Sequence, residues 1–307
     1  MNTGKLARAL GDLGRVLSDE PLKHYTTFKT GGPADILFMP GGRERTAEAV
    51  ALIREEGAPL TVIGGGSNLL VSDSGVRGVV MRICDGDGGA STPAIRADGL
   101  IAAAAGTGKK ALLRYCLEEG FTGMEFMAGI PGCVGGGIVM NAGTVDGTFA
   151  GVLAEVEYLD VAGAFTRIDV DAGVAGYRSL GLPESAVVLE GVFRLGRGAD
   201  RNEVEARISR IIAERKAKHP LDYPSAGSVF KNPPGHSSWK LIRDAGLNGA
   251  RVGGAMVSEM HTNFIVNYEN ATSSDILNLI SLVQERVYGM FSVRLEPEVR
   301  MLGTFGQ

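Results

Sequence analysis

Hydrophobic and polar residues recur with two different periods along this chain, which predicts a mixture of strands and helices. Residues 43–56 carry apolar positions at helical spacing, and residues 109–119 form a second expected helix that Gly120 is placed to end. Residues 59–63 form a short apolar run typical of a buried strand, whereas residues 153–160 alternate as in a half-buried strand.

The same two patterns extend along the rest of the chain. Strands are expected at residues 34–39, 78–83, 94–105, 186–195, 251–257, 263–266 and 293–302, and helices at residues 1–17, 202–218, 237–244 and 273–288. Ser273 or Ser274 is the expected N-cap of the last helix, and residues 85–92 are expected to form a hairpin or linker. This arrangement predicts an α+β fold punctuated by glycine.

The charged helix expected at residues 202–218 marks a boundary between the glycine-rich part of the chain and a C-terminal domain. A chain of 307 residues favours two or three compact units over one. We therefore expect units at residues 1–86, 87–198 and 199–307, with the C-terminal strand returning Glu298 to the active site.

Glycine is about twice as frequent as in an average protein, at 45 of 307 residues against roughly 7%. Two clusters stand out, residues 64–68 after a predicted strand and residues 129–143. Bare N–H groups in such runs can form a nest for a phosphate, and two runs suit a pyrophosphate held from two sides. A tight turn that needs positive φ explains a lone cluster equally well. The residues expected to contact the cofactor are Gly64, Gly65, Gly66, Ser67, Asn68, Gly129, Ile130, Pro131, Gly132, Gly135, Gly136, Asn141, Ala142 and Gly143.

Two other nucleotide-binding motifs are excluded by the sequence. Residues 106–110 differ from a P-loop because position 103 is alanine and position 110 is lysine. The chain also has no G-x-G-x-x-G that opens a helix ahead of a suitably spaced acidic residue, so a Rossmann site is not supported.

Charge and composition narrow the classes of partner. The net charge of −4 and aromatic content of 6% argue against binding to nucleic acid or to an anionic membrane. Cys84, Cys116 and Cys133 are odd in number and lack C-x-x-C spacing, so we expect no disulfide framework, no zinc or other metal site, and a reducing cytoplasm. No apolar run approaches 18 residues, so no membrane span is expected.

Three short segments place strong polar groups beside glycine or proline. They contain Arg178, Ser228 and Glu298, which offer a cation, a hydroxyl and a carboxylate. A reaction that builds negative charge and then delivers a proton needs these groups. Taken singly, each has a plainer explanation: a surface salt bridge for Arg178, a turn or cap for Ser228, and an exposed strand position for Glu298.

The ordered set of motifs resembles one known family. Residues 25–35, 61–71, 129–143, 177–179, 223–233 and 298–300 stand in the order and spacing of the UDP-N-acetylenolpyruvoylglucosamine reductase (MurB) family. The resemblance implies a p-cresol-methylhydroxylase-type FAD-binding fold of two α+β subdomains, followed by a C-terminal α+β substrate-binding domain. It also implies a cytoplasmic enzyme of peptidoglycan synthesis that uses NADPH and non-covalent FAD to reduce the enolpyruvyl ether of UDP-N-acetylglucosamine to UDP-N-acetylmuramate.

The resemblance assigns roles to particular residues. Arg178 and Glu298 would stabilise the negative charge that the substrate carboxylate takes up during the reaction. Ser228 would deliver a proton to the α-carbon. The residues expected to bind substrate are Tyr177, Lys231, Asn232, Lys240, His261 and Asn263. No nucleic acid, membrane or obligate protein partner is expected.

Arg178 and Ser228 are 50 residues apart, which resembles the shorter class of the family, without a capping-tyrosine segment. The chain departs from the family pattern at Lys29, Cys133, Gly137 and Asn248. Two alternatives stay open from the residues alone: another FAD-dependent oxidase or dehydrogenase of the same fold class, and a non-enzymatic nucleotide-sugar sensor.

Overall fold

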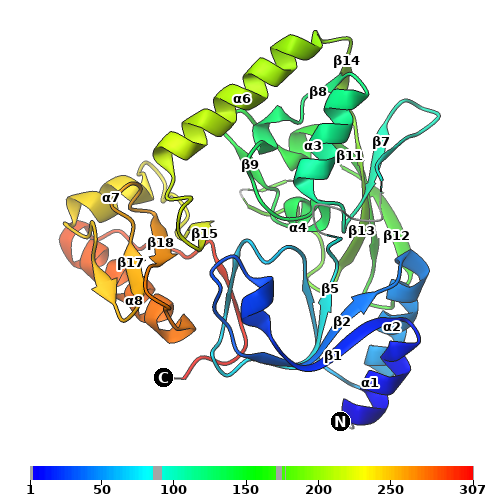
Figure 1. Cartoon of the computed structure of the whole chain (residues 1–307), viewed down its shortest axis with the longest axis horizontal. Helices are drawn as coiled ribbons and strands as arrows, with labels where there is room; N and C mark the ends of the chain where they lie inside the picture. Colours follow the sequence, from blue (N-terminus) through cyan, green and yellow to red (C-terminus); the bar gives the residue numbers. More distant parts are fainter. Residues whose placement is uncertain (1–2, 86–91, 171–174, 177, 307) are drawn as a thin grey trace. The chain divides into compact units, whose positions relative to one another are not determined.

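A computed structural model describes residues 3–85, 92–170, 175–176 and 178–306 of the chain, and shows a mixed α+β protein (Figure 1). The chain divides into two compact units. Unit 1 comprises Met1–Val16, Leu37–Gly65 and Val79–Arg215, and unit 2 comprises Leu17–Ile36, Gly66–Gly78 and Lys216–Gln307. The three-part division predicted from the sequence stays a prediction.

Unit 1 is built on an antiparallel five-stranded sheet. The strand order is β12 (Phe165–Asp169), β11 (Leu153–Leu159), β13 (Val187–Phe193), β7 (Ile101–Ala104) and β6 (Ala94–Ile95). The short helix α4 (Val134–Val139) packs against β13 and β7, and a core that includes Ile138, Phe149 and Phe193 fills the space beside the sheet. This packing fixes the glycine run that forms α4.

The remaining elements of unit 1 are shorter or lie at its edges. They are α1 (Thr3–Gly11), α2 (Arg43–Glu55), β3 (Leu60–Ile63), α3 (Lys109–Glu118), β8 (Phe121–Thr122), η2 (Glu125–Met127), β9 (Gly143–Thr144), β10 (Gly147–Thr148), α5 (Phe149–Val152), β14 (Gly196–Arg197) and α6 (Arg201–Lys218). A four-stranded sheet has the order β1 (Gly14–Pro21), β2 (Pro33–Pro40), β5 (Val76–Arg82) and β3, with β3 parallel to β5.

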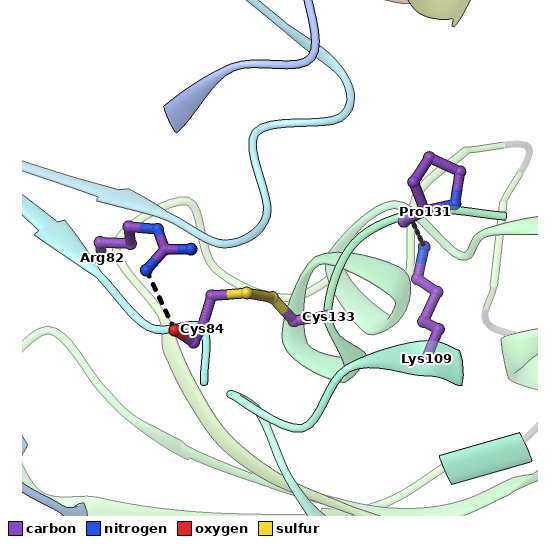
Figure 2. The surroundings of a disulfide bond; sticks show 5 residues. All are labelled: Arg82, Cys84, Lys109, Pro131 and Cys133. Atoms are coloured by element: carbon purple, nitrogen blue, oxygen red, sulfur yellow. Dashed lines mark hydrogen bonds between the residues drawn. A yellow bond between two sulfur atoms is a disulfide. The ribbon is translucent and has the colours of Figure 1, made fainter. Parts of the chain in front are cut away.

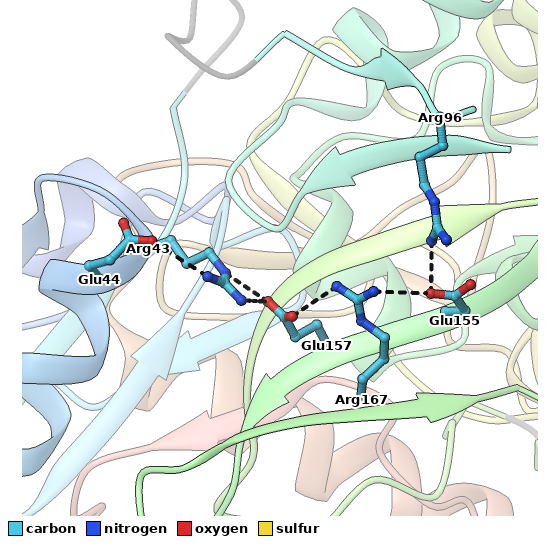
Figure 3. Close-up of polar contacts among 6 residues, drawn as sticks. All are labelled: Arg43, Glu44, Arg96, Glu155, Glu157 and Arg167. Carbon is cyan, nitrogen blue, oxygen red and sulfur yellow. Dashed lines mark hydrogen bonds and ion pairs between the residues drawn. The ribbon is translucent and has the colours of Figure 1, made fainter. Parts of the chain in front are cut away.

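A chain of ion pairs joins α2 to the outer strands of the five-stranded sheet (Figure 3). Glu157 lies at its centre, 2.6 Å from Nη2 of Arg43 and 3.0 Å from Nη2 of Arg167. Glu155 continues the chain to Arg96 at 2.8 Å. Because the Glu157 side chain is only 8% exposed, its charge depends on these partners more than a surface carboxylate would.

Unit 2 has its own sheet and core. The order is β15 (Ser225–Ser228), β18 (Phe264–Asn267), β17 (Ala255–Val257) and β16 (Arg251–Val252), all antiparallel. The long helix α8 (Ser273–Phe291) packs against β16 and β17, and α7 (Ser238–Asp244) contacts α8. The other elements are η1 (Leu22–Tyr25) and a parallel pair, β4 (Leu69–Val71) with β19 (Arg300–Leu302).

The N-terminus of α8 is capped twice. Thr272 accepts a hydrogen bond from the backbone of Asp275, whose carboxylate in turn accepts from the backbone N–H of Thr272. Asp73, about 200 residues away, accepts from the N–H groups of Ser273 and Ser274 at 2.8 and 2.9 Å. The expected N-cap at Ser273 or Ser274 was therefore wrong, since both serines lie inside the helix.

Most expected elements are confirmed, with bounds that agree within one to three residues. At both ends of the chain the structure differs from the prediction. The helix expected over residues 1–17 ends at Gly11, and residues 14–21 form β1, where close packing of Gly14 against the backbone of Met39 overrides the periodic leucines. Of the strand expected over residues 293–302, only Arg300–Leu302 forms a strand, β19. The part before it makes an isolated bridge, between Pro297 and Phe230. The expected hairpin at residues 85–92 lies mostly outside the described residues.

Several shorter differences involve turns. The strands expected within residues 94–105 are confirmed as the hairpin β6–β7, whereas the single strand expected at residues 251–257 is the hairpin β16–β17 around Gly253. Across the described segments, none of the helices is long and apolar enough to cross a membrane.

Candidate active site

Two glycine runs contact each other inside unit 1. The strand β3 leads directly into Gly64 and Gly65, and the second run continues from Gly129 into α4. A Cβ on Gly65 would lie 2.7 Å from the Cα of Gly132, so the two backbones touch where no side chain fits. Gly129 and Gly132 have φ values of +74° and +104°, which also favour glycine. The runs therefore form one backbone surface.

The second run is open at Gly136. Gly136 is exposed, and a Cβ on it would have no neighbouring atom within 4 Å. On the packed side, a Cβ on Gly135 would lie 2.8 Å from the Cβ of Ala105. Since a phosphate can reach backbone N–H groups only where no side chain intervenes, the residues present fit the pyrophosphate of FAD.

The end of the first run belongs to unit 2. A Cβ on Gly66 would lie 1.8 Å from the carbonyl oxygen of Tyr25, and Gly66 has a φ of +66°. Ser67 is half-buried beside it. Asn68 donates from Nδ2 to the carbonyl oxygen of Glu298 at 3.0 Å, and its own carbonyl accepts from the N–H of Arg300 at the same distance. The predicted cofactor residue Asn68 thus connects directly to the segment that holds Glu298.

Three further predicted cofactor residues shape the second run. Ile130 donates to Met127 in the turn before α4, and Ala142 donates to Gly137 at its end. Pro131 is exposed, and its carbonyl accepts a hydrogen bond from Nζ of Lys109 at 3.1 Å.

Basic side chains surround this run. Lys109 is 5% exposed, and its burial, followed by the charges of Arg178 and Arg215, lowers its pKa from 10.5 to about 8. The side chain of Arg215 lies against Gly129, where a Cβ would be 3.1 Å from Cδ, and burial lowers the pKa of Arg215. Concentrated positive charge at a bare glycine surface suits an anionic ligand.

Lys109 and Arg215 were not predicted as site residues. The sequence offered a signal for Lys109, because it shares the buried face of α3 with Leu112 and Cys116 at helical spacing. Lysine is almost never fully buried unless its charge is paired, so a lysine among the apolar positions of a helix is a candidate site residue.

Arg178 lies in a tight turn of unit 1. Its φ is +57°, and Gly176 pairs with Ser179 across the turn. The guanidinium donates from Nη1 to the carbonyl of Gly143 at 3.2 Å. A side chain in the left-handed region is uncommon outside functional or strained turns. The neighbouring Tyr177 lies outside the described residues.

Asn141 supports the Arg178 turn. It is 7% exposed, donates from Nδ2 to the carbonyl of Gly176 at 3.1 Å, and accepts from the N–H of Ala150 at 2.9 Å. Its amide group therefore links the end of the second glycine run to the turn that carries Arg178.

Ser228 and Glu298 lie on adjacent segments of unit 2. The N–H of Glu298 donates to the carbonyl of Val229 at 2.7 Å, and Phe230 pairs with Pro297. β15 is irregular between Ser225 and Ser228, where Gly227 has a φ of +79°. A bulge of this kind redirects the side chain that follows it. Both Ser228 and Glu298 are half-buried.

The predicted substrate residues of unit 2 fall into two groups. Asn263 brackets Phe230, accepting from its N–H at 3.0 Å and donating to its carbonyl at 2.8 Å, and Asn232 accepts from the N–H of Ser238 at 2.9 Å. Both amides hold backbone near Ser228. Lys231 pairs with the exposed Glu296, and exposed Lys240 lies 5.5 Å from the ring of Trp239.

His261 packs among other rings in unit 2. Its ring centroid lies 5.5 Å from that of His219 and 4.9 Å from that of Phe264, the residue opposite Ser228 in the sheet. Burial lowers the pKa of His261, against the effect of its own backbone hydrogen bond. His261 is therefore held in its neutral form more strongly than an exposed histidine.

Cys84 and Cys133 form a disulfide in the structure (Figure 2). Their Cα atoms are 6.0 Å apart, although 49 residues separate them in the chain. The expectation of no disulfide, drawn from the spacing and number of cysteines, was wrong because the fold brings distant cysteines together. Cys116 is buried and unpaired with the other two.

A cavity of about 600 Å³ in unit 2 lies apart from these residues. Lys29, Asn267 and Tyr268 are among its lining residues, and no predicted catalytic, cofactor or substrate residue is. Lys29, one of the departures from the family pattern, therefore faces this cavity.

Comparisons with known proteins identify both halves of the chain. A model of an FAD-binding domain matches residues 34–169, and a model of the C-terminal domain of UDP-N-acetylenolpyruvoylglucosamine reductase matches residues 219–302. The predicted fold, an FAD-binding domain followed by this C-terminal domain, is confirmed.

Full-length relatives agree with these matches. The UDP-N-acetylenolpyruvoylglucosamine reductase of Caldanaerobacter subterraneus is 41% identical over 94% of this chain and 94% of its own, and that of Listeria monocytogenes is 41% identical over 93% and 94%. The crystal structure of the Thermus caldophilus enzyme is similar with a TM-score of 0.80, at 36% identity over 94% of this chain and 100% of that chain. The chain therefore belongs to the UDP-N-acetylenolpyruvoylglucosamine reductase (MurB) family, the FAD-dependent oxidoreductases of peptidoglycan precursor synthesis.

Proposed function

We propose that this chain uses NADPH and non-covalently bound FAD to reduce UDP-N-acetylglucosamine enolpyruvate to UDP-N-acetylmuramate in the cytoplasm. The observation that carries the proposal is the pairing of the Ser228 and Glu298 segments, through the N–H of Glu298 and the carbonyl of Val229 at 2.7 Å. The segments that hold these two predicted catalytic residues, 70 positions apart in the sequence, thus lie side by side in a chain of this family.

FAD, when bound, supplies the hydride for the β-carbon of the enolpyruvyl double bond. The glycine surface around Gly65, Gly132 and Gly136 would hold its pyrophosphate. Non-covalent binding is supported by the disulfide between Cys133 and Cys84, because a sulfur bonded in this way cannot also form a covalent link to the flavin.

Arg178 would bind the substrate carboxylate, because a guanidinium matches a carboxylate with two parallel hydrogen bonds. An enol ether accepts hydride only if this conjugated carboxylate can take up negative charge. Glu298 would act in its protonated form, or share a proton with the substrate, since an ionised carboxylate would repel the growing charge.

Ser228 would donate its hydroxyl proton to the α-carbon of the substrate. Serine is a weak acid in water, but the α-carbon of an enolate is basic enough to accept its proton. Asn263 would position this step by fixing both backbone groups of Phe230, two residues from Ser228.

The remaining substrate contacts and the subclass complete the proposal. Lys231 and Lys240 would bind the anionic diphosphate or carboxylate, since both carry a positively charged amine that solvent reaches. Tyr177, Asn232 and His261 would line the same site, and the chain would belong to the shorter class of the family.

Ser228→Ala tests the role of the hydroxyl. In anaerobic stopped-flow experiments, NADPH should remove the yellow flavin absorbance of the variant as fast as that of the wild type. Recovery of colour on adding the enolpyruvyl substrate should slow by roughly 10²–10⁴-fold, the range for loss of a general acid.

Ser225→Ala is the matched control, because Ser225 begins the same strand opposite Val266. It should leave both half-reactions unchanged. Equal slowing of both half-reactions in Ser228→Ala would show that Ser228 is not the proton donor. Absence of bound flavin in the wild type would overturn the whole proposal.

A further inference from the structure

The Cys84–Cys133 pair lies next to both glycine runs of unit 1. Cys133 directly precedes α4, and a Cβ on Gly64 would lie 3.6 Å from its sulfur. Cys84 follows Ile83, whose N–H donates to the carbonyl of Ile63, the residue before Gly64. The pair therefore links the end of the β3–β5 strand pair to the start of α4, within the second glycine run.

The backbone on each side of the pair is fixed independently of the sulfur atoms (Figure 2). Arg82 donates from Nη1 to the carbonyl of Cys84 at 3.1 Å. Lys109 donates from its backbone N–H to the carbonyl of Gly132 at 3.0 Å and from Nζ to that of Pro131 at 3.1 Å. Two thiols held in this way would face each other at a high effective concentration.

The two cysteines differ in their access to solvent. Cys133 is 1% exposed, whereas Cys84 is only partly buried. An external reagent would therefore meet Cys84 first, and Cys133 would be shielded from it. One accessible and one shielded cysteine in contact is the arrangement of an attacking and a resolving thiol.

We propose that Cys84 and Cys133 are a redox-active pair whose oxidation tightens the binding of FAD. The oxidant is a low-molecular-weight disulfide. The Cys84 thiolate attacks one sulfur of this reagent and forms a mixed disulfide with it, while the S–S bond of the reagent breaks and its other sulfur leaves as a thiol. Cys133 then gives up its proton and attacks the Cys84 sulfur, which releases the second thiol. Two protein thiols and one small disulfide thus become one protein disulfide and two small thiols.

The bond would tighten FAD binding by preorganising the glycine surface. It ties the backbone next to Gly64 to the backbone next to Gly132, and the disulfide form already brings the neighbouring Gly65 into contact with Gly132. A site fixed in its bound conformation loses less freedom when ligand arrives. The thiol chemistry is independent of the proposed reductase reaction, whereas the effect on FAD rests on the proposed cofactor site.

The first test counts thiols in the full-length protein. The protein is equilibrated in mixtures of reduced and oxidised glutathione, the reaction is quenched with a thiol-alkylating reagent, and the peptides are identified by mass spectrometry. Cys84 and Cys133 should become linked to each other while Cys116 stays alkylated. Pairs that include Cys116, or glutathione left on Cys84 without a Cys84–Cys133 bond, would overturn the proposal.

The second test measures the release of FAD from the oxidised and the reduced wild type, by recovery of free-flavin fluorescence after dilution. Release should be about three- to tenfold slower from the disulfide form, the range expected for the ordering of one side chain. Equal rates would refute the effect on FAD.

Two variants serve as controls. Cys116→Ser should keep the difference between the two redox states, and Cys84→Ser should abolish it and release FAD at the rate of the reduced wild type. Because the main comparison uses one sequence in two redox states, a folding defect in either variant would leave it intact.

Discussion

Gly137 has no room for even a methyl group. A Cβ at this position would lie 2.5 Å from Cζ of Phe149, with two more ring atoms within 2.9 Å. The Phe149 ring is fully buried and packs edge-on against Phe126 and Phe193, with centroid separations of 6.1 and 5.9 Å. The ring cannot retreat without disturbing these contacts, so Gly137→Ala should force an overpacked core.

The size of the effect follows from two opposing contributions. Overpacking a well-filled core costs about 1–3 kcal/mol. Replacing glycine by alanine inside a helix returns up to about 1 kcal/mol. We expect a net loss of about 1–2 kcal/mol in the free energy of unfolding.

Urea denaturation of the FAD-free protein, followed by circular dichroism, measures this loss. Gly136→Ala is the matched control, because the preceding position in the same helix is open and exposed. It should be neutral or stabilising by up to about 1 kcal/mol. In a Phe149→Leu background, the cost of Gly137→Ala should fall by about 1 kcal/mol, because the smaller side chain makes room.

A neutral Gly137→Ala in the wild-type background would refute the packing argument. So would an equal cost with Phe149 and with leucine at that position, since the cost would then come from something other than the ring.

Three further predictions concern charge. Because the pKa of Lys109 falls from 10.5 to about 8 in the folded chain, the native state binds fewer protons than the unfolded state between these values, and stability should rise with pH across this window. Lys109→Met should abolish the rise, measured as urea midpoints at both ends of the window; an unchanged rise would assign it to another group. Asp73→Ala should lower the free energy of unfolding by about 1 kcal/mol at neutral pH, as loss of a helix cap does. Burial raises the pKa of Asp73, but hydrogen bonds from Ser273 and Ser274 outweigh it and lower the pKa below 3.8, so the difference from wild type in thermal melts should shrink as the pH falls through this range. Glu157→Gln should cost about 1 kcal/mol by weakening its ion pairs, and the cost should diminish in about 1 M salt; a salt-independent cost would point to packing instead.

Local patterns predicted the elements well because burial and periodicity agree over most of the chain. The helix at residues 43–55 and the strand at residues 60–63 needed only their own residues. β1 was missed because the close fit of Gly14 to Met39 is a tertiary contact that local propensity does not contain.

Candidate site residues could be proposed from the sequence where residue type and spacing indicate a chemistry. The glycine runs, Ser228 and Glu298 could be named from the sequence, and the structure brings the last two onto adjacent segments. Contacts between distant residues could not be predicted in this way. The sequence gives no sign that Asn263 brackets Phe230, or that Cys84 reaches Cys133.

The parallel pairing of β4 with β19 has a consequence for how the protein is made. Residues 69–71 leave the ribosome long before residues 300–302, and the contact between Asn68 and Glu298 spans 230 positions of the chain. β4 must therefore wait, without its partner strand, through the synthesis of Val79–Arg215, the largest segment of unit 1. Unit 1 closes its five-stranded sheet from residues 94–193, so it can fold while the chain is still growing. The order of synthesis thus separates the two units in time: the glycine surface of unit 1 can form early, whereas the Ser228–Glu298 pair can form only when the last strand emerges.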